Sequence, residues 1–296
     1  ACGCVQIQQV PADLGRYYPS DYWSFEKDRM AGIGLRRGLS RALRRRRTRY
    51  WLTPGRDVLG RLLAGWSEMP RHLTWARRAG IRSPDVAVLD VGCGLGDRLL
   101  SLREEGFSDL AGADPFIAQD IVYEGGVRVQ RRDLADVQGS YDYITLHHSF
   151  EHMPDPMAAM RHLRRLLRDG GTLLIRIPVA SSDAWRRYGV NWVQLDAPRH
   201  LFLHTVCSME HLAAAAGLRI AEVQHDSDMF QFWGSEQYLK DIPLYDERSY
   251  ERNRDGSIFS PEQLAAFKAQ ATQLNQLGRG DQACFYLRTT PGGQTR

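Results

Sequence analysis

The feature that most constrains the fold of this chain is an apolar run that leads straight into a glycine-rich turn. Residues 88–96 read Val-Leu-Asp-Val-Gly-Cys-Gly-Leu-Gly, and leucines at helical spacing follow them. This order predicts a buried strand, a tight turn and the N-terminus of a helix. Gly92, Gly94 and Gly96 have no Cβ atom, so the turn leaves backbone N–H groups open to a ligand beside the positive end of the helix.

Two acidic residues follow later strands, at positions where a nucleotide ligand would be held. Asp114 comes 22 positions after Gly92 and closes a short strand. A carboxylate about 20 residues past a glycine turn is where a ribose hydroxyl is bound. Asp133 follows the next strand, where its carboxylate could accept a hydrogen bond from an adenine amino group. The alternatives are that Asp114 caps a loop and that Asp133 is a solvated turn acid.

Strand and helix patterns alternate along the middle of the chain, which predicts an α/β fold with a largely parallel sheet. A helix is expected at 156–168, with Gly170-Gly171 ending it, and another at 261–277. The expected strands are residues 86–91, 109–113, 127–131, 141–147, 171–178, 218–225 and a closing strand at 283–288.

A length of 296 residues suits one large domain with additions, or two small domains. We expect an N-terminal extension over 1–80 that precedes the first strand. The core domain is expected over 81–225. Residues 226–296 are interpreted as a cap insertion followed by the last strand of the core.

Five motifs resemble, in order, the successive motifs of class I methyltransferases that depend on S-adenosylmethionine (SAM). They are residues 90–96, Asp114-Pro115, Asp133-Leu134, 141–144 and 151–156. The resemblance implies a Rossmann-like, seven-stranded mixed sheet with SAM across the C-terminal ends of its first strands, and S-adenosylhomocysteine (SAH) as product. The residues that it assigns to the cofactor are Asp90, Gly92, Cys93, Gly94, Gly96, Asp114, Pro115, Asp133, Leu134 and His147.

The spacing of the glycine turn favours SAM over a dinucleotide. The position that would complete the pattern G-x-G-x-x-G is Asp97 rather than glycine. An oxidoreductase that uses a dinucleotide remains the alternative.

Histidines follow the fourth expected strand, beside the place of the methyl group. The sulfonium methyl of SAM is already electrophilic, so a base is needed only where the acceptor must lose a proton. Neighbouring strand residues point in opposite directions, so we interpret His148 as the general base facing the acceptor and His147 as turned to the core. Ser149 is expected to contact the acceptor, and His152 to make a structural hydrogen bond.

A second polar segment, residues 191–202, follows the fifth expected strand. It resembles the Asp-x-Pro-Arg-His segment of a bacterial methyltransferase subgroup associated with glycans and small metabolites. His200 is a second candidate base, and Trp192 and Arg199 are expected to bind the acceptor. The alternative for Arg199 is an ion pair with an aspartate that pins the loop.

Two upstream aromatic residues, Tyr22 and Trp23, are expected to close over the pocket as a lid or, alternatively, to pack a helix on the sheet. Net charge is only +4, but arginines gather over residues 36–49 with leucines at helical spacing. Such a helix could contact an anionic lipid surface, a nucleic acid or a phosphorylated substrate, or could simply present a solvated face.

The remaining composition points to the cytoplasm. There is no apolar run of about 18 residues, no visible secretory leader, and the five cysteines are scattered. Cys2-Gly3-Cys4 resembles the end of the zinc module that precedes the methyltransferase domain in some sugar C-methyltransferases. The sequence lacks the second cysteine pair of that module, so we predict no bound metal.

These observations predict an enzyme that transfers a methyl group from SAM to a small-molecule or sugar-like acceptor, such as a glycan precursor. Oxygen is the favoured target atom and carbon the next. One alternative is a nucleic-acid methyltransferase that grips the backbone with the Arg-rich helix, although nucleic acid is not the favoured partner. Another is a non-catalytic scaffold that binds SAM. The sequence leaves the oligomeric state open.

Overall fold

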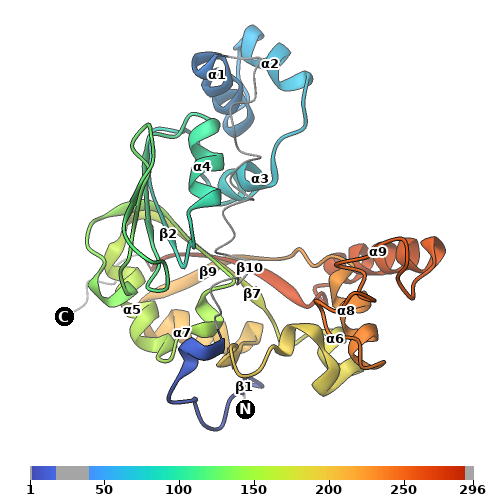
Figure 1. The fold of residues 1–296 in the computed structure, drawn as a ribbon. Coiled ribbons are helices and arrows are strands. Elements are labelled where there is room, and N and C mark those ends of the chain that lie inside the picture. Colours follow the sequence, from blue (N-terminus) through green and yellow to red (C-terminus); the bar gives the residue numbers. More distant parts are fainter. Residues whose placement is uncertain (1, 18–39, 291–296) are drawn as a thin grey trace.

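The strand that ends in the glycine turn lies at the centre of a mixed sheet. The computed structural model describes residues 2–17 and 40–290. Within them, the main sheet has eight strands in the order β4-β5-β3-β2-β6-β7-β10-β9 (Figure 1). Its strands are β2 (Ala87–Val91), β3 (Asp109–Ala113), β4 (Ile121–Val122), β5 (Arg128–Gln130), β6 (Tyr141–His147), β7 (Leu167–Pro178), β9 (Leu218–His225) and β10 (Gln282–Thr289).

The α/β prediction is confirmed, and all seven expected strands are present. The additional strand, β4, is two residues long and pairs antiparallel with β5 at the edge of the sheet. A strand of this length has too few residues to show an alternating pattern, so it could not be predicted from the sequence.

The chain order reverses beside β2. Strands β5, β3, β2, β6 and β7 are parallel, and β2 has β3 on one side and β6 on the other. Strand β10 lies between β7 and β9 and is antiparallel to both, as the family resemblance implied. A ligand crevice forms at the carboxyl ends of strands where the order reverses in this way.

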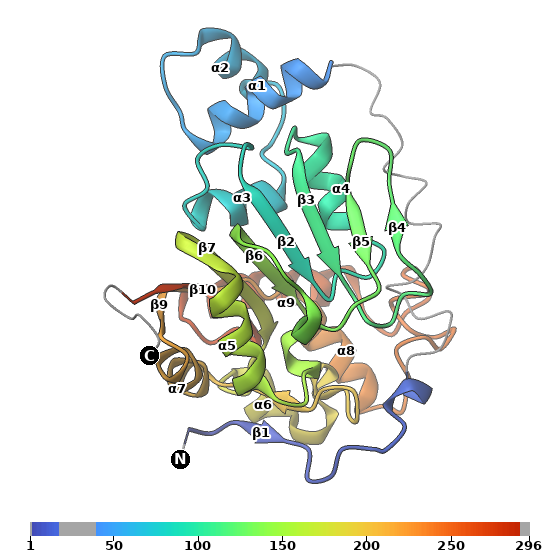
Figure 2. The same ribbon diagram turned by 90° about the vertical axis from the view of Figure 1, so that its left-hand side faces the viewer.

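Helices cover both faces of the sheet (Figures 1 and 2). On one face α5 and α7 bury Met160, Leu163 and Met209 against the strands. On the other face α3 and α4 bury Trp75 and Leu99. The helices are α1 (Arg41–Leu52), α2 (Val58–Gly65), α3 (Arg71–Arg78), α4 (Asp97–Glu104), α5 (Pro156–Leu166), α6 (Asp183–Tyr188), α7 (Val206–Ala215), α8 (Phe230–Tyr238) and α9 (Pro261–Gln276).

Two predicted helix starts are confirmed by their caps. Asp155 accepts a hydrogen bond from the backbone N–H of Ala158 at 2.9 Å at the start of α5. Ser260 and Gln263 form a capping box at the start of α9. The expected end of α5 is wrong, because the helix stops at Leu166 and Gly170-Gly171 lies within the irregular first part of β7.

The Arg-rich helix α1 is docked on the core by its own charges. Its guanidinium groups pair with carboxylates of the same chain, in the pairs Arg44–Glu104, Arg45–Asp85, Arg46–Asp57, Arg47–Glu105 and Arg49–Asp85. This part of the expected 36–49 patch is therefore not a free basic surface. Residues 36 and 37 lie outside the described residues, and so do Tyr22 and Trp23.

A third apolar cluster lies where α6, α8 and α9 meet at one end of the sheet (Figure 1). It includes Trp192, Phe232 and Leu274. Near the N-terminus, β1 (Val5–Gln6) pairs antiparallel with β8 (Phe202–Leu203). The division at residues 80 and 225 stays a proposal: α1 to α3 precede the first strand of the main sheet, and β10 returns the last segment to it.

Candidate active site

The glycine turn adopts a backbone conformation that side chains disfavour. Gly92, Gly94 and Gly96 have φ angles of 70°, 54° and 87°. A Cβ atom on Gly92 would lie 2.3 Å from the Cβ atom of Ser149. Gly96 is the N-cap of α4, so the turn delivers the helix N-terminus to the crevice.

A pocket of about 610 Å³ opens along the carboxyl ends of β2, β3 and β6. The candidate base His148 and the expected acceptor contact Ser149 line it. The cofactor residues of the sequence prediction that also line it are Gly92, Cys93, Gly94, Asp114, Pro115, Asp133, Leu134 and His147. The structure thus brings residues from four separate sequence motifs around one cavity.

Two residues assigned to the cofactor do not line this pocket. Asp90 is buried in β2, where it accepts a hydrogen bond from Oγ1 of Thr145 at 2.7 Å, and burial raises its pKa. Gly96 faces Val129, whose side chain would lie 2.8 Å from a Cβ atom at this position. Both residues support the turn from behind, which corrects their assignment as direct contacts.

Asp114 connects the glycine turn after β2 with the loop after β3. Its Oδ2 accepts the backbone N–H of Gly94 at 2.8 Å, and its Oδ1 accepts that of Phe116 at the same distance. Burial raises the pKa of Asp114, and these two N–H groups act against that shift. Each carboxylate oxygen retains a second lone pair for a ligand in the pocket.

Asp133 lies at the far end of the same pocket. It caps the 3₁₀ turn η4 (Leu134–Asp136) by accepting the backbone N–H of Ala135 at 3.1 Å. Its carboxylate lines the pocket as well. Both alternatives from the sequence therefore keep a structural basis: the residue stabilises a turn, and it has free acceptor capacity toward a ligand.

The two neighbouring histidines at the end of β6 differ in environment. His147 is buried and its ring lies 4.5 Å from that of Trp75, centroid to centroid. Burial and the nearby Arg98 and Arg176 lower the pKa of His147 well below its ordinary value. His148 is more exposed and has a φ of 52°. Both line the pocket, with His147 on its buried side.

The contacts of His148 define its tautomer. Its Nε2 lies 2.9 Å from Nη1 of Arg176. Because a guanidinium can only donate, Nε2 is the acceptor and Nδ1 carries the proton. That Nδ1 lies 3.4 Å from Oε1 of Glu151.

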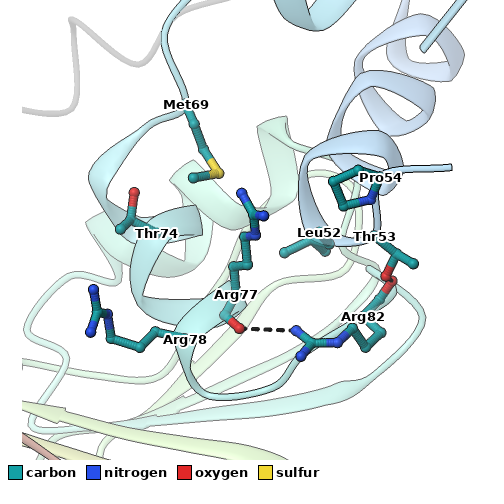
Figure 3. Close-up of a pocket in the computed structure, with 8 residues that line it drawn as sticks. All are labelled: Leu52, Thr53, Pro54, Met69, Thr74, Arg77, Arg78 and Arg82. Atoms are coloured by element: carbon teal, nitrogen blue, oxygen red, sulfur yellow. Dashed lines mark hydrogen bonds between the residues drawn. The ribbon is translucent and has the colours of Figure 1, made fainter. Parts of the chain in front are cut away.

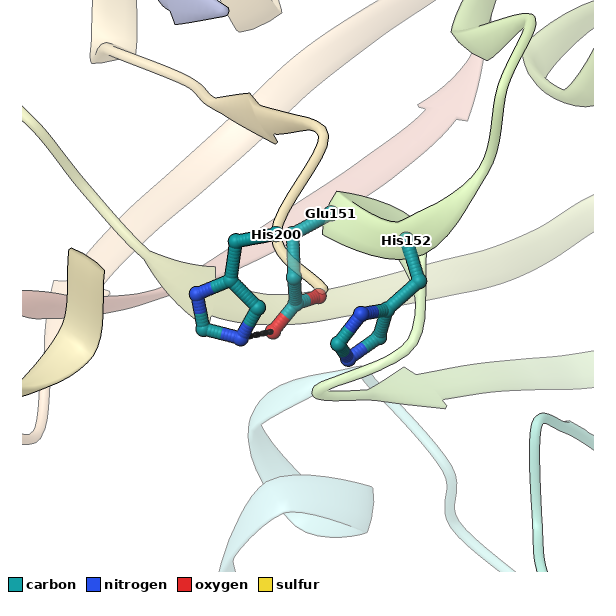
Figure 4. A group of neighbouring side chains, drawn as sticks. All are labelled: Glu151, His152 and His200. Carbon is teal, nitrogen blue, oxygen red and sulfur yellow. Dashed lines mark ion pairs between the residues drawn. The ribbon is translucent and has the colours of Figure 1, made fainter. Parts of the chain in front are cut away.

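Glu151 is the centre of a buried histidine cluster (Figure 4). Figure 4 shows Glu151 and His152 on the 3₁₀ turn η5 (Phe150–His152) and His200 approaching from another loop. Burial opposes ionisation of Glu151, but His148, His152 and His200 outweigh it and lower its pKa to about 2. His152 makes the predicted structural hydrogen bond, with Nδ1 2.8 Å from the carbonyl oxygen of Arg199.

His200 is placed against the protein rather than in the pocket. Its Nδ1 lies 2.7 Å from the carbonyl oxygen of Gln194, and its Nε2 faces Glu151 at 3.9 Å and Asp196 at 3.8 Å. The side chain is buried, and burial lowers its pKa to about 4. The assignment of His200 as a base is corrected, because neither ring nitrogen reaches the pocket.

Two residues that were expected to contact the acceptor, Trp192 and Arg199, bond to other residues of the protein instead. Trp192 is fully buried and its Nε1 donates to Oδ2 of Asp281 at 3.0 Å. Arg199 forms a two-bonded pair with Asp196, at 2.5 and 3.0 Å. This is the loop-pinning alternative that the sequence had left open, and neither side chain lines the pocket.

Several residues of the site were missed in the sequence. Arg98 and Arg132 line the pocket, and a third arginine contacts the candidate base from outside the lining. Arg176 lies in β7, holds His148 and pairs with Asp226 through Nε at 2.9 Å. Its signal was a lone charge inside the apolar run 173–178, since such a charge is rarely buried without a partner.

Among the described residues, one group of three possible metal ligands has its ligand atoms within 4.8 Å of one another. It consists of Glu151, His152 and His200. Cys2 and Cys4 are outside this group, and Cys4 Sγ lies 3.8 Å from Nδ1 of His204. The expectation that no metal is bound stays a prediction, which elemental analysis of the purified protein checks.

Comparison with known proteins shows which family the chain belongs to. A family model described as a methyltransferase domain matches residues 35–223. A ubiquinone biosynthesis O-methyltransferase of Xanthomonas campestris pv. campestris is 34% identical over 160 residues, which cover 49% of this chain and 66% of that protein. One of Pseudomonas aeruginosa is 30% identical over 117 residues, or 36% and 50% of the two chains. The chain thus spans two thirds or less of the length of these relatives.

Solved structures with a similar arrangement include an S-adenosylmethionine-dependent methyltransferase from Mesorhizobium loti, with 17% identity, a TM-score of 0.45, and coverage of 69% of this chain and 91% of that one. Another is the O-methyltransferase from a Brevibacillus brevis trans-AT PKS multienzyme in complex with S-adenosyl-L-homocysteine, with 18% identity, a TM-score of 0.45, and coverage of 82% and 80%.

The mixed sheet and the glycine corner agree with the class I methyltransferase architecture that the sequence motifs implied. The chain belongs to the methyltransferase domain family, whose model covers more than half of it. No helix among the described residues is long and apolar enough to cross a membrane.

Proposed function

We propose that this chain transfers the methyl group of SAM to a hydroxyl oxygen of a small-molecule acceptor. The observation that carries the proposal is that the glycine turn and His148 line one pocket, so a bound donor and a proton acceptor share the same space. The names of the relatives support oxygen as the target, because they are O-methyltransferases. C-methylation remains the second choice.

The residues of the pocket fit the donor part by part. The glycine turn brings bare backbone to the pocket: its glycine N–H groups are bonded within the protein, to Ala113 and Cys93 carbonyls and to Asp114, and a Cβ atom on Gly92 would meet Ser149. Asp114 keeps lone pairs for the ribose hydroxyls, and Asp133 keeps them for the adenine amino group. SAM supplies the electrophilic methyl group. The protein aligns the acceptor with that methyl and excludes water.

The acceptor hydroxyl must reach Nε2 of His148 for this histidine to take its proton. We propose that the hydroxyl replaces Nη1 of Arg176 there, while Arg176 keeps its contact with Asp226. The proton on Nδ1 then faces the ionised Glu151, which stabilises the imidazolium that forms. Glu151 is thus a positioning residue and His148 the catalytic one.

Two classes of acceptor are compatible with this proposed function. The resemblance of residues 191–202 to a glycan-associated subgroup favours a sugar-like molecule or glycan precursor. The relatives are named for ubiquinone biosynthesis, which favours other small hydroxyl compounds. A panel of nucleotide sugars and phenols, assayed with methyl-labelled SAM, separates them. NMR of the product shows whether oxygen or carbon carries the methyl.

Variants of the two histidines test the base. His148→Ala is expected to lower kcat by about 10²–10⁴ and to leave SAH affinity near that of the unchanged protein. His200→Ala is expected to lower kcat by less than His148→Ala does, because His200 reaches the site only through Glu151. His211→Ala is the matched control, because His211 is exposed on α7 and does not line the pocket. It is expected to keep kcat within a few-fold in the folded fraction. Unchanged turnover of the His148 variant contradicts the base assignment.

A further inference from the structure

Helix α2 presents an apolar stripe that no described residue covers. Val58, Leu62 and Trp66 are 61%, 55% and 90% exposed, and Leu59 is 40% exposed. Residues at i, i+4 and i+8 lie along one side of a helix, so these side chains form one continuous stripe. The opposite side is tied to the protein, with Gly60 buried against Tyr50 and Asp57.

The stripe lies on a projecting part of the molecule. In both ribbon views, α1 and α2 lie at the end away from α5, α7 and β1 (Figures 1 and 2). Scattered exposed apolar side chains are ordinary, but four on one helical face, with a tryptophan almost fully in solvent, mark a binding surface.

Cationic groups without a counter-charge surround this stripe. Residues 40–82 contain twelve arginines and, as acids, only Asp57 and Glu68. Five of the six α1 arginines pair with carboxylates of the same chain, as described above. Arg56 and Arg61, which flank the stripe, have no ion-pair partner among the described residues and are exposed.

A pocket of about 530 Å³ lies between the end of α1 and α3 (Figure 3). Met69, which follows α2, forms part of its wall, and three arginines line it. Figure 3 shows Arg77 pointing into the space between Met69 and Pro54, while Arg82 donates to the carbonyl oxygen of Arg77 at 3.0 Å. Arg77 has no carboxylate partner among the described residues, so it can pair with a phosphate.

We propose that α2 docks this protein on an anionic lipid bilayer. The apolar stripe enters the headgroup region with Trp66 at the interface, and Arg56 and Arg61 contact lipid phosphates beside it. The arginine-lined pocket takes the phosphate of one headgroup. An exposed apolar stripe flanked by two arginines that have no ion-pair partner among the described residues matches a bilayer of negative charge.

The cofactor pocket lies at the opposite ends of the strands, away from α2. The contact therefore anchors the protein and leaves the chemistry free to proceed on a dissolved acceptor. Binding to lipid does not depend on the proposed acceptor.

Sedimentation with vesicles tests the docking surface. The unchanged protein is expected to pellet with vesicles of phosphatidylcholine and phosphatidylglycerol, and much less with phosphatidylcholine alone. Leu62→Glu and Trp66→Glu are expected to reduce the bound fraction roughly tenfold. Arg61→Glu should also reduce the bound fraction, and the reduction should be larger at low salt than at high salt.

Val122→Glu is the matched control, since Val122 is 72% exposed on β4 and lines neither pocket. It should bind vesicles as the unchanged protein does, and SAH binding should be equal in all four variants. Equal sedimentation with neutral and anionic vesicles would overturn the proposal, as would equal loss in the Val122 variant. Light scattering that shows a dimer broken by Leu62→Glu would assign the stripe to a second copy and also overturn it.

Discussion

At the scale of single residues, Asp114 holds the frame of the candidate site together and lines the pocket. Its carboxylate fixes the glycine turn through Gly94 and the next loop through Phe116. One side chain thus sets the distance between the turn and the strand end where a ribose would lie. The sequence located it by spacing alone, which works because the path from one parallel strand to the next has a narrow range of lengths.

Asp114→Ala is expected to weaken SAH binding ten- to a hundred-fold, because hydrogen bonds to a charged group contribute about 1.5–3 kcal/mol. Titration calorimetry with SAH measures the change. Asp136→Ala is the control, since Asp136 belongs to η4 but does not line the pocket. Equal affinities for the two variants would remove Asp114 from the cofactor site.

Asp281 makes the free energy of unfolding fall as pH rises, whereas a carboxyl group with a lowered pKa makes it rise. Burial raises its pKa to about 6 from 3.8, against the hydrogen bonds from Trp192 and Ser227. Between these values the folded chain holds a proton that the unfolded chain has lost, so the free energy of unfolding falls as pH rises from about 4 to 6.

Asp281→Asn is expected to remove that loss and to raise the free energy of unfolding at pH 7.5 by about 1–3 kcal/mol. Asparagine still accepts from the indole of Trp192. Urea unfolding at pH 4.5 and pH 7.5 measures both effects. A variant destabilised equally at the two pH values would show that the carboxylate is not the cause.

At the scale of elements, α1 illustrates how composition can mislead. A run of arginines on a helix suggests a free basic surface, but Arg47 and Thr48 both bind the buried Glu105. The acids that pair with the arginines lie as far away in sequence as Glu104 and Glu105. Only the folded chain brings them together.

Glu105→Ala is expected to destabilise the protein by about 3–5 kcal/mol, because it leaves the charge of a nearly buried Arg47 without a carboxylate partner. Glu104→Ala removes a more exposed pair and should cost about 1 kcal/mol or less. Urea unfolding compares the two, and hydrogen exchange in α1 should increase only in the Glu105 variant. Similar losses for both would mean that α1 is not held through Glu105.

At the scale of the whole molecule, the pocket joins four strands that are separate in sequence. Its walls include the segments after β2, β3, β5 and β6, so a ligand there bridges the centre of the sheet. Binding to the folded state alone must stabilise the entire domain.

SAH at one hundred times its Kd is therefore expected to add about 2.7 kcal/mol to the free energy of unfolding. For a chain of this size that raises Tm by about 5–10 °C. Differential scanning calorimetry measures the shift, with NAD as the comparison ligand. No shift with SAH, or an equal shift with NAD, would contradict the assignment of the donor.

The sequence alone determined where the seven expected strands of the main sheet lie along the chain, the glycine corner and the acids that follow β3 and β5. These are local signals: apolar runs set strands, glycines set positive φ angles, and chain length between parallel strands sets which carboxylate meets the corner. Cap residues such as Asp155 and Ser260 are also local signals, because the start of a helix depends on about four neighbouring residues.

Only the tertiary structure decided which polar side chains face the ligand. His148 and His200 look alike in the sequence, yet one lines the pocket and the other faces Gln194 and Glu151. Trp192 and Arg199 look like acceptor contacts and are instead held by Asp281 and Asp196. A side chain's direction depends on partners far along the chain, because a buried polar group must find its hydrogen bonds wherever the fold supplies them.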